Sequence, residues 1–159
     1  MNKIIVAITC ISLLFTPLNL KRGLSYEEMT VDQRASVCSM STSDYIFISS
    51  VVEAESDRST SGDLTGRVMI AVTILNRVNS DLFPDTISEV LTQSGQFSTV
   101  HNNASCVDRT IYSDLAVIEA VQWIESGDAP AVLFFNCRGF FSGRASYGDS
   151  PIGGNYFSY

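Results

Sequence analysis

The stretch that decides the fold is Arg67-Val68-Met69-Ile70-Ala71-Val72-Thr73-Ile74-Leu75-Asn76-Arg77-Val78. Wound into a helix, this stretch carries apolar side chains on nearly every face, whereas a surface helix carries a single apolar stripe. A helix that is apolar all round is stable only when other elements cover it. We therefore expect residues 67–78 to form a central buried helix, around which the rest of the domain packs.

Three further helices are predicted, over residues 43–55, 86–93 and 114–125. The first two begin at residues that can cap a helix, and the second has capping-box spacing. Gly127 stands where a left-handed residue would end the third. Only 132–135 is typical of a strand. The sequence predicts a mainly α single domain, α+β only through a small late sheet.

The N-terminus is typical of an export signal. Lys3 precedes an apolar run from Ile4 to Leu20, and a short positive start before such a run is the pattern of a secretory signal. We expect residues 1–24 to be a secretory signal or an N-terminal anchor. Residues 25–42 are polar and mixed, and are expected to be a lead-in segment. The folded domain is expected over 43–159.

Composition and charge exclude several classes of function. The formal net charge is -7 and no basic cluster is present, which argues against nucleic acid as a partner. His101 is the only histidine, so a two-histidine zinc site is excluded and no metal or cofactor is expected. If Cys10 leaves with the signal, three cysteines remain, and a Cys106–Cys137 disulfide is predicted for an oxidising compartment.

One glutamate extends an apolar helical stripe. Ile48, Val51, Val52 and Glu55 share one face of the predicted helix. Glu53 is predicted to point to roughly the opposite face, into solvent. Glu55 is therefore the carboxyl group expected to face inward.

An inward carboxyl group has two interpretations. In an apolar wall its charged form is disfavoured, so its pKa rises, as a proton donor working near neutral pH requires. The alternative is a structural acid paired with a cation, for which Arg67 or Arg77 would serve. Spacing alone does not decide between them.

Several ordered segments resemble one known family, the SleB/CwlJ-type cell wall hydrolases, which are the spore cortex-lytic enzymes and their relatives. The similarity spans roughly residues 45–159. The segments that carry it are Val51–Glu55, Gly66–Val72, Ile74–Val78, Phe83–Ile87, Val90, Gly95–Ser98, Phe134–Asn136 and Ile152–Phe157.

The resemblance implies a compact lysozyme-like catalytic domain over 43–159. It also implies a peptidoglycan-cleaving glycosidase in which one glutamate performs both proton transfers, and the family's glutamate falls on Glu55. The function expected is that of a lytic transglycosylase that cuts the β-1,4 bond between N-acetylmuramic acid and N-acetylglucosamine. The alternatives are a hydrolytic muramidase and a non-catalytic peptidoglycan-binding module on the same fold.

The late part of the chain offers groups for binding sugar, because aromatic rings stack on sugar faces while amides and hydroxyls fix the ring edges. The substrate-binding residues expected are Gln96, Ser98, Phe135, Asn136 and Tyr156. Peptidoglycan is itself partly acidic, so the net charge gives no steering towards it and recognition must be local. The protein is expected to be a secreted monomer of the periplasm or cell wall, with transient membrane association through its N-terminal segment.

Overall fold

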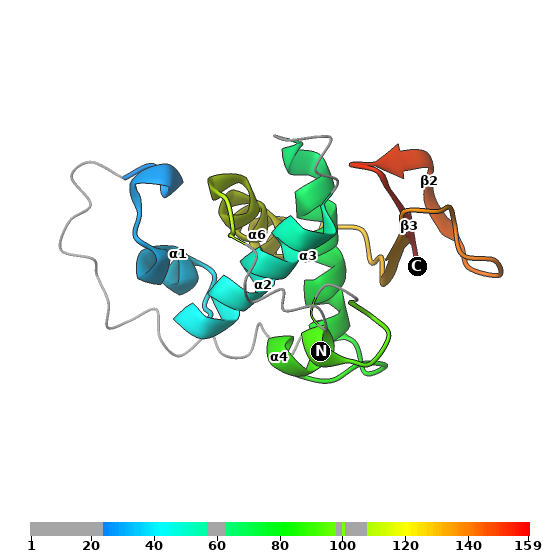
Figure 1. Cartoon of the computed structure of the whole chain (residues 1–159), viewed down its shortest axis with the longest axis horizontal. Helices are drawn as coiled ribbons and strands as arrows, with labels where there is room; N and C mark the ends of the chain where they lie inside the picture. The colour runs from blue at the N-terminus through cyan, green and yellow to red at the C-terminus, as the bar shows by residue number, and fades with distance from the viewer. Residues whose placement is uncertain (1–23, 57–62, 98–99, 101–107) are drawn as a thin grey trace.

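The computed structural model of the protein describes residues 24–56, 63–97, 100 and 108–159. Within these ranges the chain forms a helical body with a small sheet against one side (Figure 1). The elements are a 3-10 turn η2 (Tyr26–Glu28), α1 (Val31–Val37), α2 (Thr42–Glu55), α3 (Leu64–Asn79), α4 (Ile87–Thr92), α6 (Ile111–Ser126), β1 (Phe134–Asn136), β2 (Ser146–Ile152) and β3 (Asn155–Ser158). This confirms the predicted fold class.

The central helix is α3. Twelve of its 16 residues are buried, as its all-round apolar sequence predicts. It contacts α2, α4 and α6 and also touches β1 and β2. In Figure 1 it stands between the other helices and the sheet. Side chains from α3 therefore reach both parts of the molecule.

Local capping chemistry sets the ends of the helices. The Thr86 hydroxyl accepts from the Glu89 N–H at the start of α4, at 3.2 Å. Gly127 ends α6 with a φ of 82°, in the left-handed region. Helix α2 starts slightly earlier than predicted, because the Ser41 hydroxyl accepts from the N–H of Asp44 at 3.1 Å.

The lead-in segment is folded from Tyr26 onward. Arg34 of α1 is buried, and its guanidinium bonds the Asp114 carboxylate of α6 at 2.5 Å. Arg109 contacts the same carboxylate at 2.5 Å. A buried guanidinium needs such a partner, and the partner lies 80 residues away in sequence. This ion pair fixes η2 and α1 on the helical body.

The sheet has the strand order β1-β3-β2, and both pairings are antiparallel. Asn136 faces Tyr156, and Phe135 faces Phe157, across β1 and β3. The predicted strand at 132–135 is present but displaced, because β1 begins only at Phe134. Val132 precedes the strand and is fully buried. All three strands follow the last helix, as a small late sheet requires.

The structure tests the predictions for the cysteines and for the N-terminal segment only in part. Cys38 is a buried thiol and Cys137 an exposed one, both free. The predicted disulfide partner of Cys137, Cys106, lies outside the described residues, as does the N-terminal segment 1–23. In the part of the chain that the structure describes, no helix is both long and apolar enough to cross a membrane.

Candidate active site

Glu53, near the end of α2, lies where three helices meet. Its carboxylate accepts from Arg67 of α3 through two bonds, Nη2 to Oε1 at 3.0 Å and Nε to Oε2 at 3.1 Å. The hydroxyl of Thr110, the N-cap of α6, donates to Oε2 at 2.7 Å. The Arg67 side chain is only 3% exposed and that of Glu53 14%. The acid is thus locked in a forked charge-assisted pair.

The predicted contrast between the two glutamates is wrong. Glu53 was expected to face solvent, but it faces Arg67 and Thr110, while Glu53, Ala54 and Glu55 are all half-buried. A helical wheel assumes one covered face, whereas α3 and α6 both pack against α2. Arg67, an alternative partner for Glu55 from sequence, is the partner of Glu53.

The surroundings of Glu53 fix its charge. Burial alone would raise the pKa of this carboxyl group, but the hydrogen bonds from Arg67 and Thr110 and the charge of Arg67 outweigh burial. The net effect holds the Glu53 pKa below its ordinary value. Glu53 is therefore a carboxylate at neutral pH, and it does not store a proton.

A pair of glycines brings the sheet to this point. A Cβ on Gly66, in the first turn of α3, would stand 2.6 Å from the Cα of Gly153 in the β2–β3 turn. Real Cβ atoms do not approach so closely, so the two backbones meet only because both residues lack a side chain. The next residue after Gly66 is Arg67, the partner of Glu53. The end of α2, the start of α3 and the tip of the hairpin therefore lie together.

Three of the five predicted substrate-binding residues line one hollow of about 390 Å³ beside α3: Gln96, Phe135 and Asn136. Tyr156 is the cross-strand partner of Asn136, and its ring packs edge-on against Phe140 at 4.9 Å. Ser98 lies outside the described residues. The Phe135 ring also packs against Phe97 and Phe157, so it belongs partly to the core.

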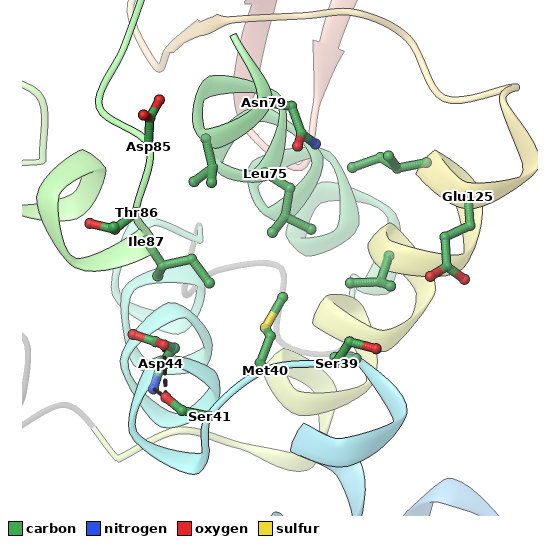
Figure 2. Close-up of a pocket in the computed structure, with 14 residues that line it drawn as sticks. Ser39, Met40, Ser41, Asp44, Leu75, Asn79, Asp85, Thr86, Ile87 and Glu125 are labelled. Carbon is green, nitrogen blue, oxygen red and sulfur yellow. Dashed lines mark hydrogen bonds between the residues drawn. The ribbon is translucent and has the colours of Figure 1, made fainter. Parts of the chain in front are cut away.

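A second hollow of about 270 Å³ lies at the start of α2 and the C-terminal part of α3, at the ends of these helices away from Glu53 and Arg67 (Figure 2). Met40, Leu75 and Ile87 point into it from the α1–α2 turn, α3 and the start of α4. None of the predicted site residues lines it. The predicted site residues that the structure describes thus lie away from it, on the side of the sheet and at the end of α2.

The family described as Cell Wall Hydrolase matches residues 61–142, just over half of the chain. The chain belongs to this family. The matched region takes in α3, α4, α6 and β1. It includes Arg67, Thr110 and every residue that lines the 390 Å³ hollow except Arg144. The family that the sequence resembles is thereby confirmed.

Individual relatives agree with this assignment. A spore cortex-lytic enzyme from Oceanobacillus iheyensis is 38% identical over 72 residues, which are 45% of this cell wall hydrolase and 25% of the relative. The chain thus spans about a quarter of the length of the curated relative it matches.

Two solved structures share the fold. The catalytic domain of the Bacillus cereus SleB protein has a TM-score of 0.61 and 27% identity, over 75% of this chain and 91% of that one. The catalytic domain of the germination-specific lytic transglycosylase SleB from Bacillus anthracis has a TM-score of 0.60 and 25% identity, over 75% and 96%.

Sequence analysis did not assign two cations to the 390 Å³ hollow, although it named Arg77 as an alternative partner for Glu55. Arg77 and Arg144 line the hollow together with Gln96 and Asn136. The burial of Arg77 could have been predicted, because an arginine in an all-apolar helix must be buried with its charge. Arg144 gave no signal in its Gly- and Ser-rich surroundings. No group of three or more His, Cys, Asp or Glu side chains that could hold a metal is found in the described ranges.

Proposed function

We propose that this cell wall hydrolase cleaves the β-1,4 bond between N-acetylmuramic acid and N-acetylglucosamine in peptidoglycan, as a lytic transglycosylase with Glu55 as its acid and base. The observation that carries the proposal is the convergence of the carboxyl-bearing end of α2 with the start of α3, the N-cap of α6 and the hairpin tip. The Bacillus anthracis domain of similar fold is described as a lytic transglycosylase, which supports this reaction.

The reaction needs a carboxylic acid that donates a proton to the glycosidic oxygen as the bond breaks towards an oxocarbenium-like state. The resulting carboxylate then takes a proton from the 6-hydroxyl of the N-acetylmuramic acid whose bond has broken. The freed oxygen closes an anhydro ring on that sugar. Both steps fall to one residue. Glu53 suits the donor role poorly because Arg67 and Thr110 hold it ionised. Glu55 lies two residues on, at the last position of α2.

Glu53 is the rival for the catalytic role. It is the glutamate on which α2, α3 and α6 converge, and an ionised carboxylate can act as a base or stabilise an oxocarbenium-like cation. The apolar stripe is buried as predicted, but the two glutamates that follow it are both half-buried, so it does not favour Glu55 over Glu53. The choice of Glu55 rests on the family resemblance and on the locked charge of Glu53.

The decisive experiment compares Glu55→Gln, Glu53→Gln and, as a control, Glu119→Gln on the exposed face of α6. Glutamine keeps the shape of glutamate but supplies no proton, so we expect Glu55→Gln to stay folded and lose about 10²–10⁴-fold in the rate of wall cleavage. Glu53→Gln is assayed below its own unfolding temperature and is expected to retain cleavage. A folded Glu55→Gln variant that still clears peptidoglycan overturns the assignment, and loss in Glu53→Gln alone transfers the role to Glu53.

Mass spectrometry of the released fragments separates the alternative functions. Anhydro-sugar ends support the transglycosylase, whereas reducing ends indicate the muramidase, in which water replaces the 6-hydroxyl. A non-catalytic module would bind walls and release no fragments. Wild-type protein and the Glu119→Gln control should give the same products.

A further inference from the structure

Arg77 is a buried cation in an aromatic cage. Its side chain extends from α3 and is 4% exposed. The guanidinium carbon lies 5.0 Å from the ring centre of Phe83, 5.2 Å from that of Phe97 and 5.6 Å from that of Phe134. Nε donates to the carbonyl of Leu133 at 2.7 Å. The rings stabilise the charge in part, and the carbonyl takes one of five N–H donors.

One nitrogen of this guanidinium is not satisfied by the described part of the chain. Nη1 is buried and finds no acceptor there. The ion pairs found in the same ranges use Arg34, Arg67 and Arg109, and none of them reaches Arg77. A buried, unpaired donor of this kind costs free energy unless something fills the position. The missing partner is an acceptor, and preferably a negative one.

A second cation stands beside the first. The Arg144 guanidinium lies 3.4 Å from the ring centre of Phe134, the ring that Arg77 also contacts. Burial, and then the charge of Arg144, lower the pKa of Arg77 to about 10. Two like charges held near each other repel, and an anion between them would remove the repulsion. The protein as a whole has a net charge of -7, so this local excess of positive charge is the opposite of its overall charge.

The hollow that these arginines share has the room and the polar groups for a small planar anion. Its volume is about 390 Å³, and the amides of Gln96 and Asn136 line it along with both arginines. Guanidinium groups bind carboxylates through paired N–H donors, and amide N–H groups complete the remaining oxygen positions. A sulfate or phosphate would also find donors, but a wall polymer offers carboxylates.

We propose that the hollow between α3 and β1, bounded by Arg77, Arg144, Gln96 and Asn136, binds a carboxylate group of the cell wall polymer. The inference deepens the proposed function and rests on it. It explains how an acidic protein holds a partly acidic polymer, since the general field repels the polymer while one local site attracts it. The carboxylate is either that of the lactyl ether of a muramic acid that carries no stem peptide, or that at the end of a stem peptide.

The position of the hollow fits one bound strand. Arg77 follows Gly66 by eleven residues in α3, so the two lie about 16 Å apart at 1.5 Å per residue. Gly66 marks the contact of α3 with the hairpin tip beside the proposed active site, and β1 and β2 also contact α3. A polymer whose bond is cut at the α2 end would present its next acidic groups along this side.

The test is a titration of the full-length protein, followed by NMR, with three soluble probes. N-acetylmuramic acid carries the lactyl carboxylate, acetyl-D-alanyl-D-alanine carries a peptide carboxylate, and N-acetylglucosamine carries none. We expect at least one acidic probe to bind and Arg144→Gln to weaken that binding about ten- to hundredfold, the loss typical of a charged hydrogen bond. The probe whose affinity falls identifies the source of the carboxylate.

The matched control is Arg138→Gln, which removes the same charge from an exposed position outside the hollow. It should bind the acidic probes like the wild type. Arg77→Lys keeps the charge but loses the planar fork, so it should weaken binding while remaining folded. Equal affinities in wild type and Arg144→Gln, or binding of neither acidic probe, overturn the inference.

Because these titrations do not depend on cleavage, they separate this inference from the proposed function. Binding that requires Arg144 in a protein that cuts no wall leaves the carboxylate site standing and removes the proposed reaction. Cleavage with unchanged KM in Arg144→Gln, and no probe binding, removes the carboxylate site alone. If both hold, Arg144→Gln raises KM for wall cleavage and leaves kcat near its original value.

Discussion

Arg67 donates hydrogen bonds to two residues. It forms the forked pair with Glu53, and its Nη1 donates to the carbonyl of Asp63 at 3.0 Å. Because Asp63 also caps α3, the same side chain ties the start of α3 to the end of α2. Its partner Glu53 remains 14% exposed, so the pair is neither a loose surface bridge nor a fully dry one. Its contribution to the free energy of unfolding should therefore lie between those of exposed and of fully buried ion pairs.

This pair predicts a particular dependence of stability on pH. The pKa of Glu53 is lower in the folded protein than its ordinary 4.5, so the unfolded chain binds more protons as the solution becomes acidic. The contribution of Glu53 is fully present above its unfolded pKa and is lost as the pH falls through its folded pKa. Glu53→Gln should lower the free energy of unfolding by about 1.5–3 kcal/mol at neutral pH, with a much smaller difference in acid.

Urea denaturation of wild type and Glu53→Gln at about pH 7 and about pH 3 measures this difference. Glu119→Gln again serves as the control, because its exposed carboxylate has no buried partner to lose among the described contacts. A stability gap that stays constant across the acid range would show that the Glu53 charge does not stabilise the fold.

At the level of elements, sequence predicted what is local and missed what is distant. The cap of α4 at Thr86 and the glycine stop of α6 depend on neighbours in the chain, and both were predicted. The surroundings of Glu53 could not be, because its partner Thr110 comes from an element 57 residues later. The burial of Arg34 could not be predicted for the same reason, because its partner Asp114 lies 80 residues later in the chain. In the candidate site, the amides and aromatic groups were predicted, while the two arginines of the hollow were not.

The contact between α3 and the β2–β3 turn yields a prediction for Gly66→Ala. Alanine is a better helix former than glycine by about 1 kcal/mol. The added methyl group, however, would meet the backbone of Gly153 at 2.6 Å, and overpacking against backbone costs about 1–3 kcal/mol. We expect a net loss of stability and a larger loss of wall cleavage, since the hairpin tip must move away from α3.

Thermal unfolding and a wall-clearing assay on the same preparations check this prediction. Thr65→Ala is the control, because Thr65 is an exposed neighbour in the same helix turn. If Gly66→Ala were as stable and active as Thr65→Ala, the close approach of the two glycines would have no consequence for the site.

For the whole molecule, α3 is the connection between the helical body and the sheet. The Asn76 side-chain amide donates to the carbonyls of Pro130 and Val132 at 2.8 Å and 3.0 Å. The next residue, Arg77, bonds the carbonyl of Leu133. Three backbone carbonyls of the segment leading into β1 are therefore held by two adjacent side chains of one helix. The orientation of the sheet, and of every binding group on it, depends on these bonds.

Asn76→Ala should loosen the sheet relative to the body. It leaves two carbonyls without their donor, which costs about 1–3 kcal/mol. We expect a lower melting temperature and lower backbone order parameters for the amides of β1 and β3, with those of α6 unchanged as an internal control. Unaltered order parameters in β1 would mean that Arg77 alone suffices to hold the sheet.

The two arginines on Asp114 have a consequence for how the molecule opens. When α1 lifts away, Asp114 loses Arg34 but keeps Arg109, which lies only five residues before it. The buried anion is then never left without a cation, and the α6 end of the body is not destabilised by the departure. We therefore expect the opening of α1 to cost less free energy than it would if Arg34 were the sole cation on Asp114, because the second arginine continues to neutralise the buried acid.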